Sequence, residues 1–332
     1  MLEKPNIPKE LIIARAQEGY DLFVAELTFL PIGADLRTAV YRLISDDGIS
    51  YFLKLRKKFH EVIVRAPVFL HQHGVQEVMI PYPTKSKQYW ADFGDYKIIL
   101  YPFVEGKNGF EVDLTDQQKQ TLGAALKRIH SIQVPPELRQ LIRKESFNLG
   151  WRESMREYQA QAETDTFMEP TAAKLAEFIR SKQSEITRLV ERSQQLASQL
   201  QPEKLDPVLC HSDFHGGNIL ISDIGELYIV DWDDPMLAPK ERDLMFIGSA
   251  IDDLWESQRD IDLFYRGYGK TKVNRPALAY YRYERVIEDL AVICDQLLLS
   301  DEGGADREQA YRWFTSNFEP GSTIEIAERT DA

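Results

Sequence analysis

The stretch Cys210–Asp234 reads CHSDFHGGNILISDIGELYIVDWDD and is the most informative part of the chain for the fold. Two apolar runs, Ile219–Ile221 and Leu227–Val230, flank a polar turn that contains Asp223 and Gly225. Short β-branched runs separated by such a turn are typical of a β-hairpin. We therefore predict a hairpin here, with Asp223 at its distal turn and without a role in catalysis.

The hairpin predicts that three oxygen-bearing side chains converge. Asn218 precedes the first strand and Asp231 follows the second, so antiparallel pairing places them at the same end, and Asp213 lies in the loop that leads there. Carboxylate and amide oxygens suit a hard cation such as Mg²⁺, and a further Asp beside a Mg²⁺-phosphate site can orient an attacking hydroxyl. The alternative, polar residues that only make turn hydrogen bonds, is common for one Asp or Asn but less so for the whole set.

The two histidines of the stretch raise the possibility of zinc. His211 and His215 lie near Cys210, but the spacing matches neither HExxH nor a paired-cysteine site. We interpret His211 as a structural histidine and His215 as a bystander. Asp233 and Asp234 stay open between neighbours of the metal site, substrate contacts and turn residues.

Composition narrows the function classes. The 332 residues include 40 Lys plus Arg and 53 Asp plus Glu, a net charge of −13, which does not indicate a nucleic-acid-binding protein and suits solubility or cationic small molecules. The two cysteines, Cys210 and Cys294, predict no disulfide framework. The N-terminus lacks the apolar stretch of a signal peptide, and no apolar run approaches the ~20 residues that cross a bilayer. We expect a soluble cytoplasmic protein with no membrane association and no obligate protein partner.

The predicted secondary structure changes once along the chain, from mostly strands to mostly helices. Strand patterns dominate residues 24–57 and 77–106, with a helix between them at 61–73 that contains Pro67. Helical patterns follow near 115–134, 171–200 and 277–299. We predict an α+β chain with a small antiparallel lobe carrying one helix, residues 1–104, and a larger mostly helical lobe, residues 105–332.

The motifs resemble a known family. HSDFHGGN fits H-x-D-x-x-x-x-N, and IVDWDD places Asp231 thirteen residues after Asn218. Together with YPFVEGKNGF and YYRYERVIEDLAV, these motifs resemble the aminoglycoside phosphotransferase family of the protein-kinase-like fold. The resemblance implies a bilobal fold in which residues 1–104 bind nucleotide and residues 105–332 carry the catalytic loop and the substrate cleft.

The resemblance also implies roles for single residues. Asp213 is similar to the catalytic base, Asn218 and Asp231 to the Mg²⁺ ligands, and Lys54 to the strand lysine that contacts the ATP phosphates. Glu61 is the expected partner of Lys54, with Glu77 a poorer one. Further nucleotide contacts are expected in the loop with Gly33 and Asp35, which lacks G-x-G-x-x-G, and in the linker with Tyr101 and Phe103.

The implied activity is transfer of the γ-phosphate of ATP, with Mg²⁺, to a hydroxyl of a cationic aminocyclitol or aminoglycoside antibiotic, with spectinomycin the first expectation and resistance the outcome. Ser212 replaces the arginine that reads activation-loop phosphate in protein kinases, which favours an unregulated small-molecule kinase. Acids available for a cationic substrate are Asp234, Glu241 and Glu284, together with Asp252, Asp253 and Asp289; Asp243 is expected to brace the catalytic loop. Two alternatives stay open: a kinase of a choline-like, sugar or amino-acid metabolite, and a nucleotide-binding pseudokinase.

Overall fold

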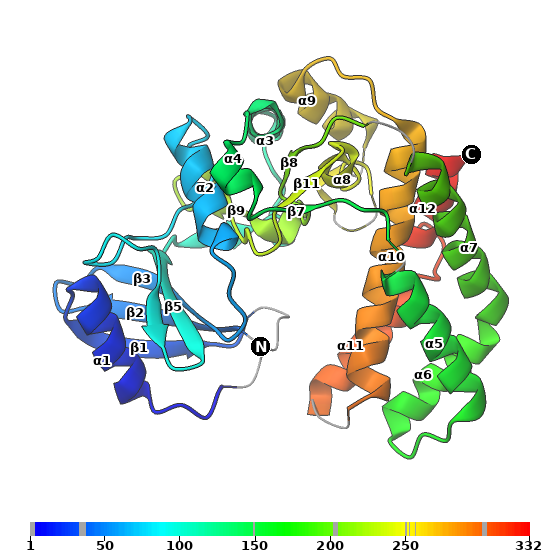
Figure 1. The fold of residues 1–332 in the computed structure, drawn as a ribbon, viewed down its shortest axis with the longest axis horizontal. Coiled ribbons are helices and arrows are strands. Elements are labelled where there is room, and N and C mark those ends of the chain that lie inside the picture. Colours follow the sequence, from blue (N-terminus) through cyan, green and yellow to red (C-terminus); the bar gives the residue numbers. More distant parts are fainter. Residues whose placement is uncertain are drawn as a thin grey trace. The chain divides into compact units, whose positions relative to one another are not determined.

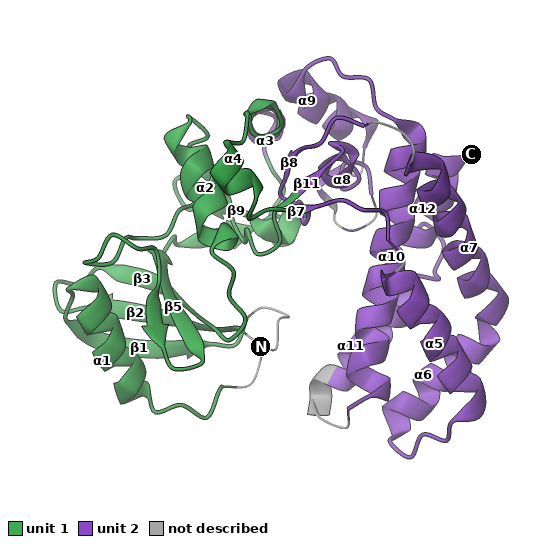
Figure 2. Cartoon of the chain, viewed as in Figure 1, with its two compact units in different colours: residues 1–114, 125–143, 216–236 green, residues 115–124, 144–215, 237–332 purple. Residues whose placement is uncertain are grey.

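The computed structural model describes residues 4–32, 38–148, 150–201, 205–249, 251, 253–255, 257–300 and 304–332. The chain divides into two compact units (Figure 2): residues 1–114, 125–143 and 216–236 form unit 1, and residues 115–124, 144–215 and 237–332 form unit 2. The predicted lobe 1–104 falls within unit 1, whereas residues 105–114, 125–143 and 216–236 of the predicted second lobe also belong to unit 1. The lobe functions stay predictions. Within the described residues, every helix is too short or too polar to cross a bilayer.

Unit 1 is built on a five-stranded antiparallel sheet in the order β1-β2-β3-β5-β4 (Figure 1). Its strands are β1 Val24–Leu30, β2 Thr38–Ser45, β3 Ser50–Arg56, β4 Ala91–Phe93 and β5 Tyr96–Pro102. The predicted turn between β2 and β3 is confirmed, and Gly48 there has a φ of 83° that favours glycine. The β3 side chains Leu53 and Leu55 are fully buried on one face of the sheet, so Lys54 points to the other.

Two helices accompany this sheet where the sequence predicts one. The predicted helix is α2, Val62–Gln72, which continues through Pro67. The additional helix is α1, Lys9–Tyr20, whose Ile12 and Ala16 pack into the same core as Leu53. The expectation of a single helix is therefore wrong. Helix α1 buries only these two residues, so its apolar pattern is too weak to be recognised in the sequence.

The predicted hairpin is confirmed and belongs to unit 1. Strands β9 (Ile219–Ser222) and β10 (Leu227–Ile229) pair antiparallel, and β6 (Gly106–Asn108) adds to β9 in the order β10-β9-β6. A Cβ on Gly106 would lie 2.1 Å from the carbonyl oxygen of Ile221, so glycine is required for this close approach. The short helix α4, Pro136–Arg139, completes the unit.

Unit 2 is mostly helical. Its longest helix, α10, packs against α5, α7 and α12 (Figure 1). The helices are α5 Gly150–Thr164, α6 Pro170–Ser181, α7 Gln183–Leu200, α8 Glu241–Leu244, α9 Gln258–Tyr268, α10 Arg275–Leu298, α11 Gly304–Ser316 and α12 Thr323–Asp331; α3, Asp116–Ser131, has residues in both units. A small sheet has the order β7-β11-β8, with β7 Arg143–Lys144, β11 Met236–Ala238 and β8 Val208–Cys210; its residues Arg143 and Met236 are counted with unit 1. The 3₁₀ turn η2, Asp253–Trp255, belongs to unit 2, and the turn η1, Gly216–Asn218, belongs to unit 1.

One predicted helix is two. The pattern over residues 171–200 is divided at Lys182, whose φ of −105° and ψ of 10° leave the helical region and end α6. The apolar stripe reaches Ile179 in α6 and resumes at Ile186 in α7, a spacing of seven that a single helix would also show. The expectation of one helix is therefore wrong. The break at Lys182 leaves the spacing of the apolar residues unchanged, so the sequence pattern does not reveal it.

Candidate functional site

Lys54 lies at the centre of a charged cluster in unit 1. Its ammonium lies 2.6 Å from Asp231 Oδ1 and 3.5 Å from Asp233 Oδ1, and Arg56 forms an ion pair with the other oxygen of Asp233. The Lys54 side chain is only 12% exposed. Burial acts to lower the pKa of Lys54, but the two carboxylates outweigh it and raise the pKa well above its usual range. The cluster thus consists of two cations from β3, Lys54 and Arg56, and two carboxylates that pair with them, Asp231 and Asp233.

Asn218 and Asp231 occupy the end of the hairpin that the sequence predicts. Ile219 pairs with Ile229, and the N–H of Val230 donates to the carbonyl of Asn218 at 3.0 Å, so the two site residues flank the last pair of the ladder. Asp231 has a φ of 63°, a left-handed conformation that costs energy for a non-glycine residue and is common at functional sites. A carboxylate and an amide, with phosphate oxygens and water, suit the oxygen ligand set of Mg²⁺.

Asp233 takes the place beside Lys54 that the sequence assigns to Glu61. Glu61 lies at the N-terminus of α2 and pairs with Arg65 at 3.4 Å, and Glu77 pairs with Arg128 at 2.5 Å. Among the described residues, the carboxylates paired with Lys54 are Asp231 and Asp233. The sequence signal for Asp233 is its position two residues after Asp231, on the same loop.

The predicted adenine contacts lie at the end of β5, which pairs with β3. Tyr101 pairs across the sheet with Phe52, and the ring of Phe103 lies 6.5 Å from that of Phe52, with the guanidinium of Arg42 4.4 Å from its centroid. Burial raises the pKa of the Tyr101 hydroxyl well above its usual range. The predicted loop residues Gly33 and Asp35 lie outside the described residues.

Asp213 follows β8 in unit 2, on a loop held by a buried carboxylate. Asp243, fully buried, accepts hydrogen bonds from the backbone N–H groups of His211 (2.9 Å) and Ser212 (2.7 Å), which confirms that it braces this loop. Ser212 has a φ of 76°, and the N–H of Asp213 donates to His211 Nδ1 at 3.3 Å. The loop backbone is therefore held in a strained conformation by groups of unit 2.

The Asp213 carboxylate lies between two nitrogen donors. Arg285 Nη1 donates to Oδ1 at 2.5 Å, and His215 Nε2 lies 3.3 Å from Oδ2. Burial acts to raise the pKa of Asp213, but the hydrogen bond from His215 and the charge of Arg285 outweigh it and hold the pKa well below its usual range. The interpretation of His215 as a bystander is wrong, because its Nε2 lies 3.3 Å from the Asp213 carboxylate. Arg285 is a residue that sequence reasoning missed, although it lies in YYRYERVIEDLAV.

The acids predicted for a cationic substrate lie in different surroundings. Glu241 is 2% exposed and accepts a hydrogen bond from the N–H of Asn274, and Glu284 is 8% exposed and pairs with Arg152 at 3.2 Å. Glu241 and Glu284 thus both have partners within unit 2, and we do not propose them as substrate contacts. Asp234, in unit 1, is exposed and pairs with Arg143. Asp252 lies outside the described residues, as does the side chain of Asp253.

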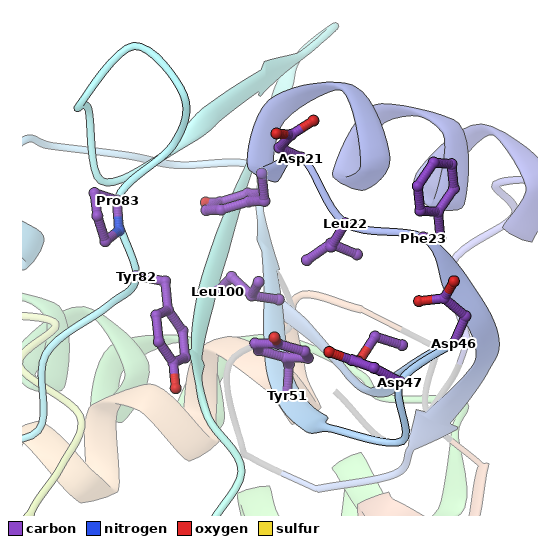
Figure 3. Close-up of a pocket in the computed structure, with 11 residues that line it drawn as sticks. Asp21, Leu22, Phe23, Asp46, Asp47, Tyr51, Tyr82, Pro83 and Leu100 are labelled. Carbon is purple, nitrogen blue, oxygen red and sulfur yellow. The ribbon is translucent and has the colours of Figure 1, made fainter.

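A cavity of about 270 Å³ lies elsewhere in unit 1 (Figure 3). Tyr51 and Tyr82 form its aromatic wall with ring centroids 5.4 Å apart, and Asp46 and Asp47 come from the turn between β2 and β3. None of the predicted site residues lines this cavity.

Comparison with known proteins decides the family. The model of the phosphotransferase enzyme family matches residues 28–281, which include every paired residue of the cluster around Lys54 and the loop of Asp213. The chain belongs to the phosphotransferase enzyme family. It is therefore a phosphotransferase with the protein-kinase-like fold, as the motif around Asp213 and Asn218 indicates.

Solved structures of this family match almost the whole chain. Spectinomycin phosphotransferase APH(9)-Ia, solved with ADP and spectinomycin, is 36% identical, with a TM-score of 0.92 over 98% of this chain and 99% of that one. The amicoumacin kinase hAmiN, solved with AMP-PNP, Ca²⁺ and its ligand, is 19% identical, with a TM-score of 0.62 over 96% and 97% of the two chains, and shows the shared fold.

A curated relative matches part of the chain. Protein StrN of Streptomyces griseus is 25% identical over 180 residues, 53% of this chain. The match spans 56% of the length of StrN.

Proposed function

We propose that this phosphotransferase transfers the γ-phosphate of ATP, with Mg²⁺, to a hydroxyl of spectinomycin. The observation that supports the acceptor is the 36% identity and TM-score of 0.92 to a spectinomycin phosphotransferase over 98% of the chain. The acidic net charge of −13 suits a substrate that is cationic through its amines. The retained Lys54, Asp213, Asn218 and Asp231 argue against a pseudokinase.

Unit 1 supplies the nucleotide side of the proposed reaction. Lys54 exchanges its contact with Asp231 for the α- and β-phosphates, while Asp233, itself held by Arg56, keeps the ammonium in place. Asn218 and Asp231 would hold Mg²⁺, which supplies neutralisation of phosphate charge when bound. Tyr101 and Phe103 flank the adenine.

Unit 2 supplies the acceptor side. The Asp213 carboxylate accepts a hydrogen bond from the substrate hydroxyl and orients its oxygen toward the γ-phosphorus. A bond forms between that oxygen and phosphorus as the bond from phosphorus to the bridging oxygen of ADP breaks, and the hydroxyl proton passes to Asp213 and then to solvent. Asp234 of unit 1, exposed and paired with Arg143, is the acid we propose as a contact for a substrate amine.

The test is phosphorylation of purified substrates. We expect Mg·ATP and spectinomycin to give ADP and a product heavier by one phosphoryl group in mass spectrometry, with Asp213→Asn inactive but folded. A panel of choline, ethanolamine, sugars and amino acids, followed by ADP release, covers the alternative acceptors. Product from a panel member and none from spectinomycin would overturn the acceptor and leave the reaction type standing.

The cellular role follows from the same acceptor. We place the protein in the cytoplasm, where ATP is available, and expect expression in a susceptible bacterium to raise the inhibitory concentration of spectinomycin. The Asp213→Asn variant, expressed to the same level, is the control. An unchanged inhibitory concentration with active enzyme would exclude resistance as the role.

A further inference from the structure

We propose that Arg285 is a positioning residue for Asp213, fixing the carboxylate in the orientation that receives the acceptor hydroxyl. The inference rests on the proposed function, in which Asp213 orients that hydroxyl. Arg285 Nη1 contacts Oδ1 of Asp213 at 2.5 Å, and His215 Nε2 lies 3.3 Å from Oδ2. These two nitrogen donors contact different oxygens of the carboxylate, which restricts its rotation.

Arg285 is itself held rigidly. It lies within α10, the longest helix of unit 2, and its Nε lies 3.0 Å from Asp289, one turn further along the same helix. Its guanidinium carbon lies 5.7 Å from the centroid of the buried ring of Phe246. Because the guanidinium is planar, two carboxylate contacts and one ring fix both its position and its plane. The donor is in place before any substrate binds.

Phe246 connects the donors of Asp213 to the brace of the loop. The ring of His215 lies 6.1 Å from that of Phe246, so both nitrogen donors pack on one aromatic side chain. Phe246 comes three residues after Asp243, whose carboxylate holds the backbone of the loop. One segment, residues 243–246, thus supports the backbone of the loop and, through Phe246, the side chains around Asp213.

The charges around Asp213 favour its ionised form. His211, His215 and Arg285 face it, and Arg285 in turn faces Asp289, with Glu288 and Arg242 beyond. Arg285 therefore stays charged while it serves two carboxylates. An Asp213 held ionised is a weak base and a good hydrogen-bond acceptor, which suits a loose phosphoryl-transfer transition state in which the hydroxyl keeps its proton until late.

The kinetic experiment compares Arg285→Met and Arg285→Lys with the wild type. The matched control is Arg192→Met, which removes another arginine–aspartate pair of unit 2, with Asp331 at 2.5 and 2.7 Å, away from the loop. We expect Arg285→Met to lower kcat by about 10²-fold, the loss that a displaced reacting group can cause, and Arg285→Lys to recover part of it. We expect the KM for ATP to change by less than about threefold, since ATP binding does not use Asp213.

The pH dependence separates positioning from a structural role. In Arg285→Met we expect the acid limb of kcat to move to higher pH, because Asp213 loses its cationic partner. Arg192→Met should lose thermal stability without changes in kcat or in that limb. Wild-type kcat and acid limb in Arg285→Met, with or without a loss of stability, would overturn the inference. If Arg285→Met does not fold, Arg285→Lys carries the same two measurements, with an intermediate kcat expected and a wild-type kcat overturning the inference.

A measurement without substrate keeps the two proposals distinguishable. The carboxyl carbon of Asp213, assigned by its loss in Asp213→Asn, is titrated by ¹³C NMR in the wild type and in both Arg285 variants. If no acceptor is phosphorylated by the wild type, the proposed function fails, whereas an upward shift of the Asp213 pKa in the variants still supports Arg285 as the group that holds this carboxylate. An unchanged Asp213 pKa overturns the inference whatever the acceptor.

Discussion

The ammonium of Lys54 lies 2.6 Å from Oδ1 of Asp231, although 177 residues separate them along the chain. The pair joins the proposed phosphate-binding lysine to a proposed metal ligand, and Asp233 adds a second carboxylate 3.5 Å away. In the proposed function, contacts of Lys54 with phosphate would replace its contact with Asp231, which would then be available to hold Mg²⁺. The pair therefore keeps two functional charges neutralised in the free protein.

Lys54→Met should destabilise the free protein. With the ammonium removed, Asp231 and Asp233 stand side by side without their shared cation, and we expect a loss of about 1–3 kcal/mol in the free energy of unfolding. Asp231→Asn should relieve part of that loss, so a double-mutant cycle in urea should show a coupling energy between positions 54 and 231. Simple additivity of the two changes would contradict a working ion pair.

Asp233, rather than Glu61, should position Lys54 for ATP. We expect Asp233→Asn to raise the KM for ATP about tenfold, since Lys54 loses the carboxylate that stays beside it after Asp231 turns to the metal. Glu61→Gln is the matched control, because Glu61 is 47% exposed and pairs with Arg65. The KM values are measured from initial rates over a range of ATP concentrations. A larger rise in KM in Glu61→Gln than in Asp233→Asn would show that Glu61, the partner predicted from the sequence, positions Lys54.

The hairpin and the closeness of Asn218 to Asp231 were predictable because they depend on short-range order. Asn218 and Asp231 are brought together by two strands and one turn, and two short apolar runs on either side of a polar turn are enough to define such a unit. The loop that we propose to be catalytic is similarly local, since His211, Asp213 and Asn218 lie within eight residues. These are the parts of the site in which the sequence pattern and the structure agree.

The long-range ion pairs were not predictable in the same way. With 40 basic and 53 acidic residues in the chain, many pairings are compatible with the pattern, and only the folded backbone selects among them. Arg285 reaches Asp213 across 72 residues, and Asp233 replaces Glu61 because the loop after β10, not the start of α2, reaches Lys54. The same limit explains why Glu241 and Glu284 were predicted as substrate contacts. The sequence shows that they are acidic but not that they are buried.

Asp243 should be required for both stability and turnover. Its carboxylate is fully buried and accepts from two backbone N–H groups, so Asp243→Ala leaves two buried donors without their acceptor. We expect a loss of about 2–4 kcal/mol in the free energy of unfolding and a fall in kcat from the displaced loop. Thermal unfolding and kcat are measured on the same preparation. A variant with wild-type kcat at a lower melting temperature would show that the loop keeps its shape without this brace.

Removal of divalent metal should abolish transfer, and Asn218→Ala should raise the metal requirement. The amide of Asn218 is one of two protein ligands we assign to Mg²⁺, and a magnesium site with one ligand fewer depends more on water and phosphate. We expect EDTA to stop product formation reversibly, and Asn218→Ala to need about tenfold more Mg²⁺ for half-maximal rate. Asn108→Ala, on the neighbouring strand β6, is the control. An unchanged Mg²⁺ requirement in Asn218→Ala would remove this residue from the site.

The stability of unit 2 should depend on Glu169 in acid. Glu169 caps α6 by accepting from the N–H of Ala172 at 2.7 Å, and it accepts from Arg307 of α11 at 2.6 Å. Burial acts to raise the pKa of Glu169, but these hydrogen bonds, that from Arg307 first, lower it to about 2 from the usual 4.5. Because the folded pKa lies below the unfolded one, the stabilisation is complete above about pH 4.5 and is lost as the pH falls toward 2.

Comparison of the wild type with Glu169→Gln isolates this contribution from that of the other carboxylates. Glutamine keeps the length and an oxygen acceptor but not the charge, so we expect the wild type to be more stable by about 1–3 kcal/mol at pH 7 and the difference to shrink between pH 4.5 and 2. Urea unfolding at a series of pH values measures it. The control is Glu308→Gln, whose exposed partner Lys174 predicts a much smaller stability difference than that of Glu169→Gln at every pH. A stability difference for Glu169→Gln that does not vary with pH would mean that the carboxylate acts through its shape alone and that the charge of Arg307 is not what holds α6 to α11.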